Sequence, residues 1–86
     1  MEQTELKIPK IRVAPSIQGI LVPKEYRDPW VQPGTLVEVD LFDLETGEKV
    51  ITYRGEVTSR YVVRIKSAYI DLVQIGEWYR AVVRKV

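Results

Sequence analysis

The sequence predicts a small all-β domain. Polar and apolar residues alternate with a period of two in several short segments. The clearest is 35–42, where Val37, Val39 and Leu41 fall on one face. A polar segment at 43–50 separates two such runs, as a hairpin turn does. Segments of the same kinds then follow one another in the same order in both halves of the chain.

The first half is predicted to form two strands, a short helix and a third strand. Residues 6–14 alternate, and Pro9 inside them indicates an edge strand or a bend, because proline has no N–H for a β-ladder. Residues 19–22 form a short strand that Pro23 ends. Pro23 also suits the first turn of a helix, and Pro29 limits that helix to about one turn.

The second half repeats this order. Gly47 can take the positive φ that a hairpin turn requires, and the chain then enters a strand at 48–58, with Gly55 predicted as a bulge. A strand at 60–65 leads to a short helix, for which Ser67 is the predicted N-cap. An alternating strand closes the chain.

A short motif supports an internal duplication. Val-Gln-X-Gly occurs at 31–34 and again at 73–76, which is 42 positions later, and Tyr26 and Tyr69 are 43 positions apart. Three strands cannot cover their own core, whereas six can close into a barrel without free edges. We therefore expect a six-stranded barrel built from two β-β-α-β repeats with short helices. The predicted organisation is a single domain, 1–86, with repeat one at about 6–43 and repeat two at about 48–86.

Composition excludes several kinds of chemistry. The chain has no cysteine and no histidine, so disulfides, His- or Cys-ligated zinc and His-based catalytic triads cannot form. The net charge of +1 is too small to indicate nucleic-acid binding by itself. The first ten residues are too charged for a signal peptide, and no apolar run approaches membrane length. We expect a soluble cytoplasmic protein with no membrane partner.

Charge is unevenly distributed along the chain. An acidic belt, which ends just before Lys49, separates two mildly basic regions. Its members are Glu38, Asp40, Asp43, Glu45 and Glu48. A solvated charged surface is one interpretation of this pattern. The other is that the basic regions form a binding surface.

One segment resembles a known structural unit. The stretch from Ile20 to Val39 is similar to the strand–helix–strand unit of AbrB/MazE-type transcription factors. The matching positions are Pro23, Lys24, Glu25, Tyr26, Arg27, Pro33 and Gly34. The resemblance covers about 11–43 well and about 56–83 weakly.

The sequence departs from the AbrB pattern at several positions. Thr35 stands where the turn of the family has Asp, and Pro29 lies inside the helix. In the second half, Lys66 replaces the proline and Ile70 replaces the arginine. Two copies in one chain resemble the pseudo-twofold members of this superfamily of barrels, which includes riboflavin-kinase-like barrels.

The resemblance implies a DNA-binding transcriptional regulator or chromatin-type factor. Arg27 carries over by matching position and Lys24 lies beside it, while Arg12, Arg60 and Arg64 flank the equivalent inter-strand loops. These cations would neutralise phosphates and reach base edges in the major groove. Each is also explained as an ordinary surface charge.

Two alternatives remain. The turn at 32–39 is similar to one in CTP-dependent riboflavin kinases, where Thr and Asn bind metal and nucleotide. Thr35 is present, but Val37 occupies the Asn position and cannot ligate magnesium, so we expect no enzyme, no cofactor and no bound metal.

The second alternative is a non-catalytic protein-interaction barrel module that binds itself or another protein. Aromatic residues at strand spacing usually belong to the core. Trp30 follows Pro29 at the end of the predicted helix. It is the aromatic residue that we most expect to be partly exposed at a partner surface.

Overall fold

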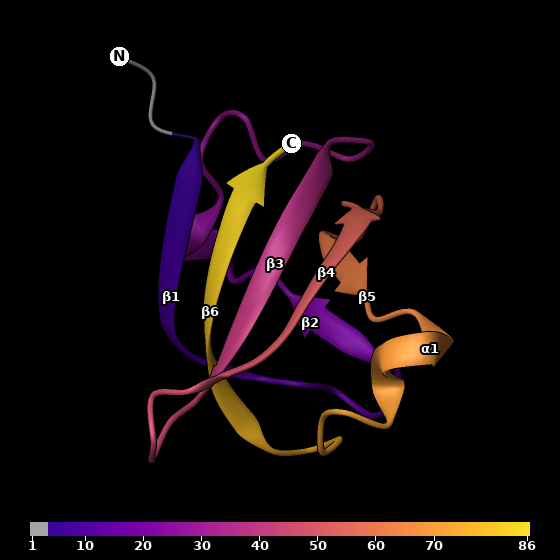
Figure 1. The fold of residues 1–86 in the computed structure, drawn as a ribbon. Helices are drawn as coiled ribbons and strands as arrows, with labels where there is room; N and C mark the ends of the chain where they lie inside the picture. Colours follow the sequence, from indigo (N-terminus) through magenta and orange to yellow (C-terminus); the bar gives the residue numbers. More distant parts are fainter. Residues whose placement is uncertain (1–3) are drawn as a thin grey trace.

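The computed structural model describes residues 4–86, so the first three residues of the predicted domain lie outside the described residues. The fold is mostly β, with one 3-10 turn and one helical turn (Figure 1). In chain order the elements are β1 (Glu5–Arg12), β2 (Gly19–Leu21), the 3-10 turn η1 (Lys24–Tyr26), β3 (Leu36–Asp43), β4 (Lys49–Glu56), β5 (Val62–Arg64), α1 (Ser67–Ile70) and β6 (Trp78–Lys85). The predicted order of strands and short helices is confirmed.

The strands form two separate antiparallel sheets. The long strands lie side by side in the order β1-β6-β3-β4, and β2 pairs with β5 in a short ribbon behind them (Figure 1). No ladder within residues 4–86 joins the two sheets. The structure therefore has a sheet and a ribbon rather than the closed six-stranded barrel that we expected.

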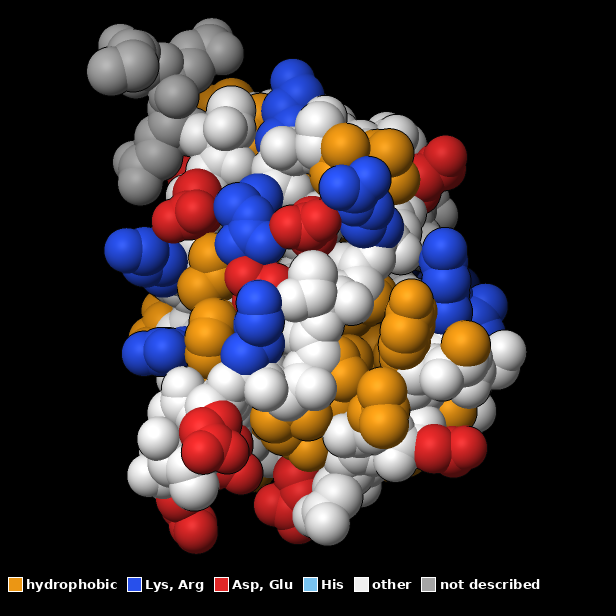
Figure 2. Space-filling view, in the orientation of Figure 1, with side chains coloured by type: hydrophobic (Ala, Val, Ile, Leu, Met, Phe, Trp, Pro, Cys, Tyr) orange, Lys and Arg blue, Asp and Glu red, His pale blue; other side chains and the backbone are white. Residues whose placement is uncertain are grey.

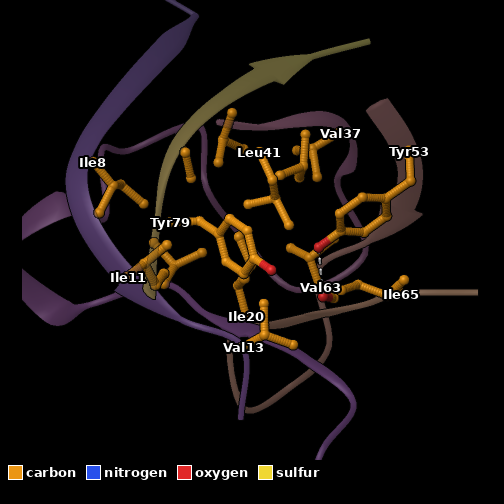
Figure 3. Packing of buried hydrophobic residues seen from close by; sticks show 14 of the residues in the cluster. Ile8, Ile11, Val13, Ile20, Val37, Leu41, Tyr53, Val63, Ile65 and Tyr79 are labelled. Atoms are coloured by element: carbon orange, nitrogen blue, oxygen red, sulfur yellow. Dashed lines mark hydrogen bonds between the residues drawn. The ribbon is translucent and has the colours of Figure 1, made fainter. Parts of the chain in front are cut away.

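The ribbon approaches the sheet most closely at β4 and β5. The Tyr53 hydroxyl donates a hydrogen bond of 3.0 Å to the carbonyl oxygen of Val63 (Figure 3). A Cβ atom on Gly55 would lie 3.4 Å from Cγ1 of Val63. Gly55 pairs regularly with Val37, so its prediction as a bulge was wrong. β5 packs against β4 here, close enough for a Cβ at Gly55 to make van der Waals contact with Val63.

The core lies between the sheet and the ribbon. The alternating side chains predicted for 35–42 are confirmed, because Val37, Val39 and Leu41 are fully buried. From the ribbon, Ile20 and Val63 point into the same cluster (Figure 3). This burial of apolar surface is the main stabilising contribution in a chain without disulfides.

The outer strand β1 has the features of a protected edge. The register of its pairing with β6 shifts between Ile8 and Ile11, at the position of Pro9. Lys7 and Lys10 are exposed on this strand. Proline and lysine disfavour pairing with another chain, so the expectation of an edge or a bend at Pro9 is confirmed on both counts.

The hairpin predicted at 43–50 connects β3 to β4. Gly47 has a φ of +76° and donates its N–H to the carbonyl oxygen of Asp43 over 2.9 Å. The Asp43 carboxylate accepts hydrogen bonds from the N–H groups of Glu45 and Thr46, at 2.7 and 3.0 Å. These two hydrogen bonds, from Thr46 and Glu45, lower the pKa of Asp43.

The two helical segments are each about one turn long, as predicted. η1 begins after Pro23, whose ψ of 147° is extended, and α1 begins after Lys66, whose ψ is 148°. The prediction of Ser67 as an N-cap was wrong, because Lys66 holds that position and no side chain caps the helix. No helix in residues 4–86 is long and apolar enough to cross a membrane.

Backbone geometry recurs at corresponding positions of the two halves. Gly34 and Gly76, 42 positions apart, both have a φ of +93°. The Gly34 N–H donates to Val57 over 2.7 Å, and the Gly76 N–H donates to Val13 over 2.8 Å. Both glycines therefore end the same kind of turn ahead of a long strand.

Strand pairing shows the same relation. Asp40 of β3 faces Val82 of β6, and these two residues are 42 positions apart. Ile20 of β2 faces Val63 of β5, 43 positions away.

Candidate nucleic-acid interface and apolar groove

The outer face of the four-stranded sheet carries a network of ion pairs. Arg84 contacts Glu38 at 2.6 Å and Asp40 at 2.7 Å, and Arg54 contacts Glu38 at 3.0 Å. The Thr52 hydroxyl also donates to Asp40 over 2.6 Å. Blue and red side chains accordingly alternate over this face (Figure 2). Arg54 and Arg84 are thus engaged with two members of the acidic belt.

These contacts shift the protonation of both carboxylates. Hydrogen bonds from Arg84 and Arg54 lower the pKa of Glu38. Burial acts to raise the pKa of Asp40, but hydrogen bonds from Arg84 and Thr52 outweigh it and the pKa is lowered. The hydrogen bonds of Arg84 to Asp40 and Glu38 raise the pKa of Arg84 itself. All three groups stay charged at neutral pH, so the positive charge of Arg84 is balanced by the carboxylates that it contacts.

Two of the predicted DNA-binding residues lie together beside the ribbon. Arg60 precedes β5 and Arg64 ends it, and both are exposed. They line a shallow cavity of about 240 Å³, whose other lining residues are Ser16, Ile17, Thr58 and Val62. The Thr58 hydroxyl accepts hydrogen bonds from the N–H groups of Arg60 and Val62, at 3.3 and 3.1 Å, and so fixes this turn.

Arg27 reaches the same turn from η1. Its guanidinium lies 4.0 Å from the centre of the Tyr61 ring, and its Nε donates to the Val22 carbonyl over 3.0 Å. Because Tyr61 adjoins Arg60, Arg27 is brought close to the Arg60 turn. Lys24 is exposed on η1. We call Lys24, Arg27, Arg60 and Arg64 the basic corner.

Arg12 is separate from the basic corner. It ends β1, faces Trp78 across the ladder, and its Nε donates to the Gly76 carbonyl over 3.0 Å. The Arg12 side chain thus supports the turn before β6. Of the five predicted DNA-binding cations, Arg12 is the one that the fold directs to another part of the surface.

Trp30 is partly exposed, as expected, but it packs against the hydrophobic core. Its indole N–H is buried and has no acceptor among residues 4–86. The more exposed tryptophan is Trp78, at 46%. Sequence reasoning missed it, although the alternation of Tyr79, Ala81 and Val83 toward the core assigns Trp78 to the outside.

Trp78 borders the larger cavity, of about 540 Å³, between the β3–β4 hairpin and the turn before β6. We call this cavity the apolar groove, after the exposed apolar side chains on its wall, although charged and polar side chains supply more of its exposed lining. Leu44, Leu72 and Trp78 line it and are 44%, 58% and 46% exposed. Its other lining residues are Lys10, Asp43, Glu45, Val50, Gln74, Glu77 and Tyr79. Hydrophobic side chains are also visible near the lower end of the face in Figure 2.

In the turn at 32–39, which we compared with a turn of riboflavin kinases, Thr35 and Val37 make contacts within the fold. The Thr35 hydroxyl donates to the Trp30 carbonyl over 3.2 Å, and Val37 is fully buried. Neither residue is presented to a ligand. In the described part of the chain, no cluster of three or more carboxylates is close enough to hold a metal ion.

Comparisons with known proteins identify the fold without a function. No family model matches the sequence, and no curated protein is significantly similar to it. The chain is similar in structure to PHS018 from Pyrococcus horikoshii, which was solved in solution. The TM-score is 0.76 and the identity 22%, over 98% of this chain and 94% of PHS018. This likeness places the chain in the same fold as PHS018.

Proposed function

We propose that this chain is a duplicated AbrB-like domain, in which residues of about 6–43 and about 48–86 are copies of one ancestral unit. The equal φ of Gly34 and Gly76 supports this origin. So do the positive φ values of Gln18 and Tyr61, 48° and 62°, at positions 43 apart. A non-glycine residue in this conformation is uncommon, so its recurrence at corresponding positions carries weight.

On this basis the protein is a cytoplasmic regulator that binds DNA through the basic corner. The observation that carries the proposal is that Arg60, just before β5, and Arg64, at the end of β5, line a common cavity. Within residues 4–86, the ion pairs involve only Arg54 and Arg84. The guanidinium groups of Arg60 and Arg64 are therefore available to phosphates, which release counterions on binding.

Arg27 has a different part in this proposal from the exposed cations. Stacking on Tyr61 and the hydrogen bond to Val22 fix its guanidinium in one orientation. A fixed, planar donor suits bidentate recognition, whereas mobile cations such as Lys24 suit phosphate contacts. The basic corner thus combines one oriented guanidinium with three exposed charges.

A fluorescence-anisotropy titration of labelled duplex DNA over a range of salt concentrations tests the proposal. We expect the double variant R60Q/R64Q to reduce the slope of log K against log salt by about two, roughly one for each cation removed. The matched control is R80Q, because Arg80 is exposed on the sheet face, where it stacks on Phe42 at 4.7 Å.

No binding of duplex DNA by the unaltered chain at tens of micromolar and low salt would overturn the proposal, since non-specific binding alone reaches about this strength. A reduction of the slope by about one in R80Q, as large per cation removed as in R60Q/R64Q, would overturn the assignment to the basic corner. That result would mean that overall charge, and not the corner, determines binding.

A second role, as a non-catalytic protein-interaction module, is supported by a different surface. The apolar groove exposes Trp78 and Leu72 to solvent, and exposed aromatic residues in a concave apolar site are typical of binding hot spots. The two roles are compatible, because Arg60 and Arg64 do not line this groove.

A further inference from the structure

The apolar groove combines exposed hydrophobic side chains with a net negative rim. Leu44 comes from the β3–β4 hairpin, Leu72 from the segment after α1, and Trp78 from the start of β6. Three separate segments therefore supply the apolar surface. A concave site of this kind loses unfavourable hydration when apolar side chains fill it.

The charged side chains of the groove are unequal in sign. Asp43, Glu45 and Glu77 line it with negative charge, and Lys10 supplies the one positive charge among its lining residues in 4–86. The Lys10 ammonium lies over the Trp78 ring, 4.9 Å from its centre. The groove therefore already holds one cation against its aromatic residue, next to carboxylates that attract more.

We infer that the apolar groove is a docking site for a short basic, amphipathic segment of a partner protein. Apolar side chains of the segment would fill the space between Leu44, Leu72 and Trp78, and flanking Lys or Arg would meet Glu45 and Glu77. This inference rests on the proposed role as a protein-interaction module and states the chemistry of the partner. It does not depend on DNA binding.

Charge argues against a second copy of this chain as the occupant. A symmetric dimer brings the same patch of both copies together. The net negative patch that includes Asp43, Glu45 and Glu77 would then face the same net negative patch of the second copy, and like charges brought together across an interface disfavour association. A basic partner turns the same charges into a favourable contribution.

The size of the groove limits the partner to a short segment. At about 540 Å³ it can receive a few side chains, which is much less than a standard protein–protein interface buries. We therefore expect micromolar affinity and rapid exchange, with Trp78 as the main anchor. Negative charge at the rim mainly accelerates association and confers specificity.

The test is a titration of the full chain, labelled with ¹⁵N, with a short synthetic amphipathic peptide of leucine and lysine. The comparison peptide has glutamate in place of lysine. We expect the lysine peptide to shift the signals of Leu44, Leu72 and the Trp78 indole, and the glutamate peptide to leave them unchanged. W78A and L72S should each weaken binding by about tenfold.

Matched variants separate the groove from general surface effects. Leu36 is 45% exposed and corresponds in position to Trp78, so L36S removes a comparable exposed apolar side chain from the other half of the molecule. We expect L36S and R60Q/R64Q to bind the lysine peptide like the unaltered chain. E45Q/E77Q should weaken binding, and K10Q should strengthen it.

Three results would overturn the inference. The first is no shift at millimolar lysine peptide, and the second is equal binding of the glutamate peptide. The third is concentration-dependent self-association, seen by sedimentation, with shifts of the groove signals in the absence of peptide. Loss of DNA binding in R60Q/R64Q would leave the inference intact, so the two proposals fail separately.

Discussion

The two Val-Gln-X-Gly turns have the same φ at their glycines, Gly34 and Gly76, but different side chains around them. Trp30 and Leu72 occupy corresponding positions, 42 residues apart, just before the Val-Gln-X-Gly turn of each half. Trp30 packs against the core, whereas Leu72 is 58% exposed and lines the apolar groove. The larger side chain covers its part of the core, and the smaller one lies beside an open cavity.

The same contrast holds for the short helical turns. Arg27 stacks on Tyr61 and contributes to the basic corner, while the corresponding Ile70 packs against the core. One half thus has a cation where the other has an apolar residue. The two Val-Gln-X-Gly turns thus share backbone angles, while the side chains around them give the two parts of the surface different chemistry.

The largest expected effect comes from truncating the two corresponding residues. W30A removes a side chain packed on the core and should destabilise the fold by about 3 kcal/mol, the low end for tryptophan because Trp30 is only partly buried. L72A should change the free energy of unfolding by less than about 0.5 kcal/mol. Urea denaturation followed by circular dichroism measures both, and similar losses in the two variants would remove the contrast.

Smaller effects are expected at the two glycines that share a φ of +93°. G34A and G76A each force an L-residue into a left-handed conformation, at a cost of about 1–2 kcal/mol. Space is not limiting, because an added Cβ has no neighbour within 4 Å at Gly34, and at Gly76 its nearest neighbour is Nη2 of Arg12 at 3.7 Å. Thermal unfolding should show similar losses. A loss in only one variant would mean that the two turns differ in strain.

The smallest expected change in stability concerns Asp40, which faces Val82, the residue 42 positions later, in the four-stranded sheet. Interactions with Arg84 and Thr52 lower the folded-state pKa of Asp40 despite its burial. The resulting stability is therefore present above the unfolded pKa of about 4 and is lost as pH falls through the lower folded value.

The D40N variant should accordingly be less stable than the unaltered chain by about 1 kcal/mol at pH 7, with the difference shrinking below pH 4. Urea denaturation at several pH values measures this. The control is V82A, whose effect should not change over the same pH range because no titrating group is altered. A D40N difference that persists at low pH would contradict the assignment.

Much of the local structure could be predicted from the sequence. Proline restricts φ and glycine widens it, so single residues can predict local features. Pro9 predicted the edge strand, Pro23 the start of the first helical turn and Gly47 the hairpin. Two local predictions were wrong, the cap at Ser67 and the bulge at Gly55. In the second case Gly55 simply continues the pairing of β4 with β3, a partner that no local pattern reports.

The candidate sites were only partly predictable. Arg60 and Arg64 were predicted in one strand, and both line the same cavity. The assignment of Arg12 to the same surface remained a prediction that the geometry does not favour, because Arg12 supports Gly76 instead. The apolar groove was not foreseen, since its lining comes from three segments whose proximity depends on the pairing of β3 with β6.

The sequence by itself determined where the strands, turns and helical segments lie, because those choices depend on the period of the side chains and on the φ of proline and glycine. Only the tertiary structure decided which charges are neutralised and which surface stays open. Arg84 contacts Asp40 and Glu38, which are 44 and 46 positions away in the sequence, and Trp78 and Leu44 line the same groove. Such contacts depend on strand register, which is set by the packing of the whole core.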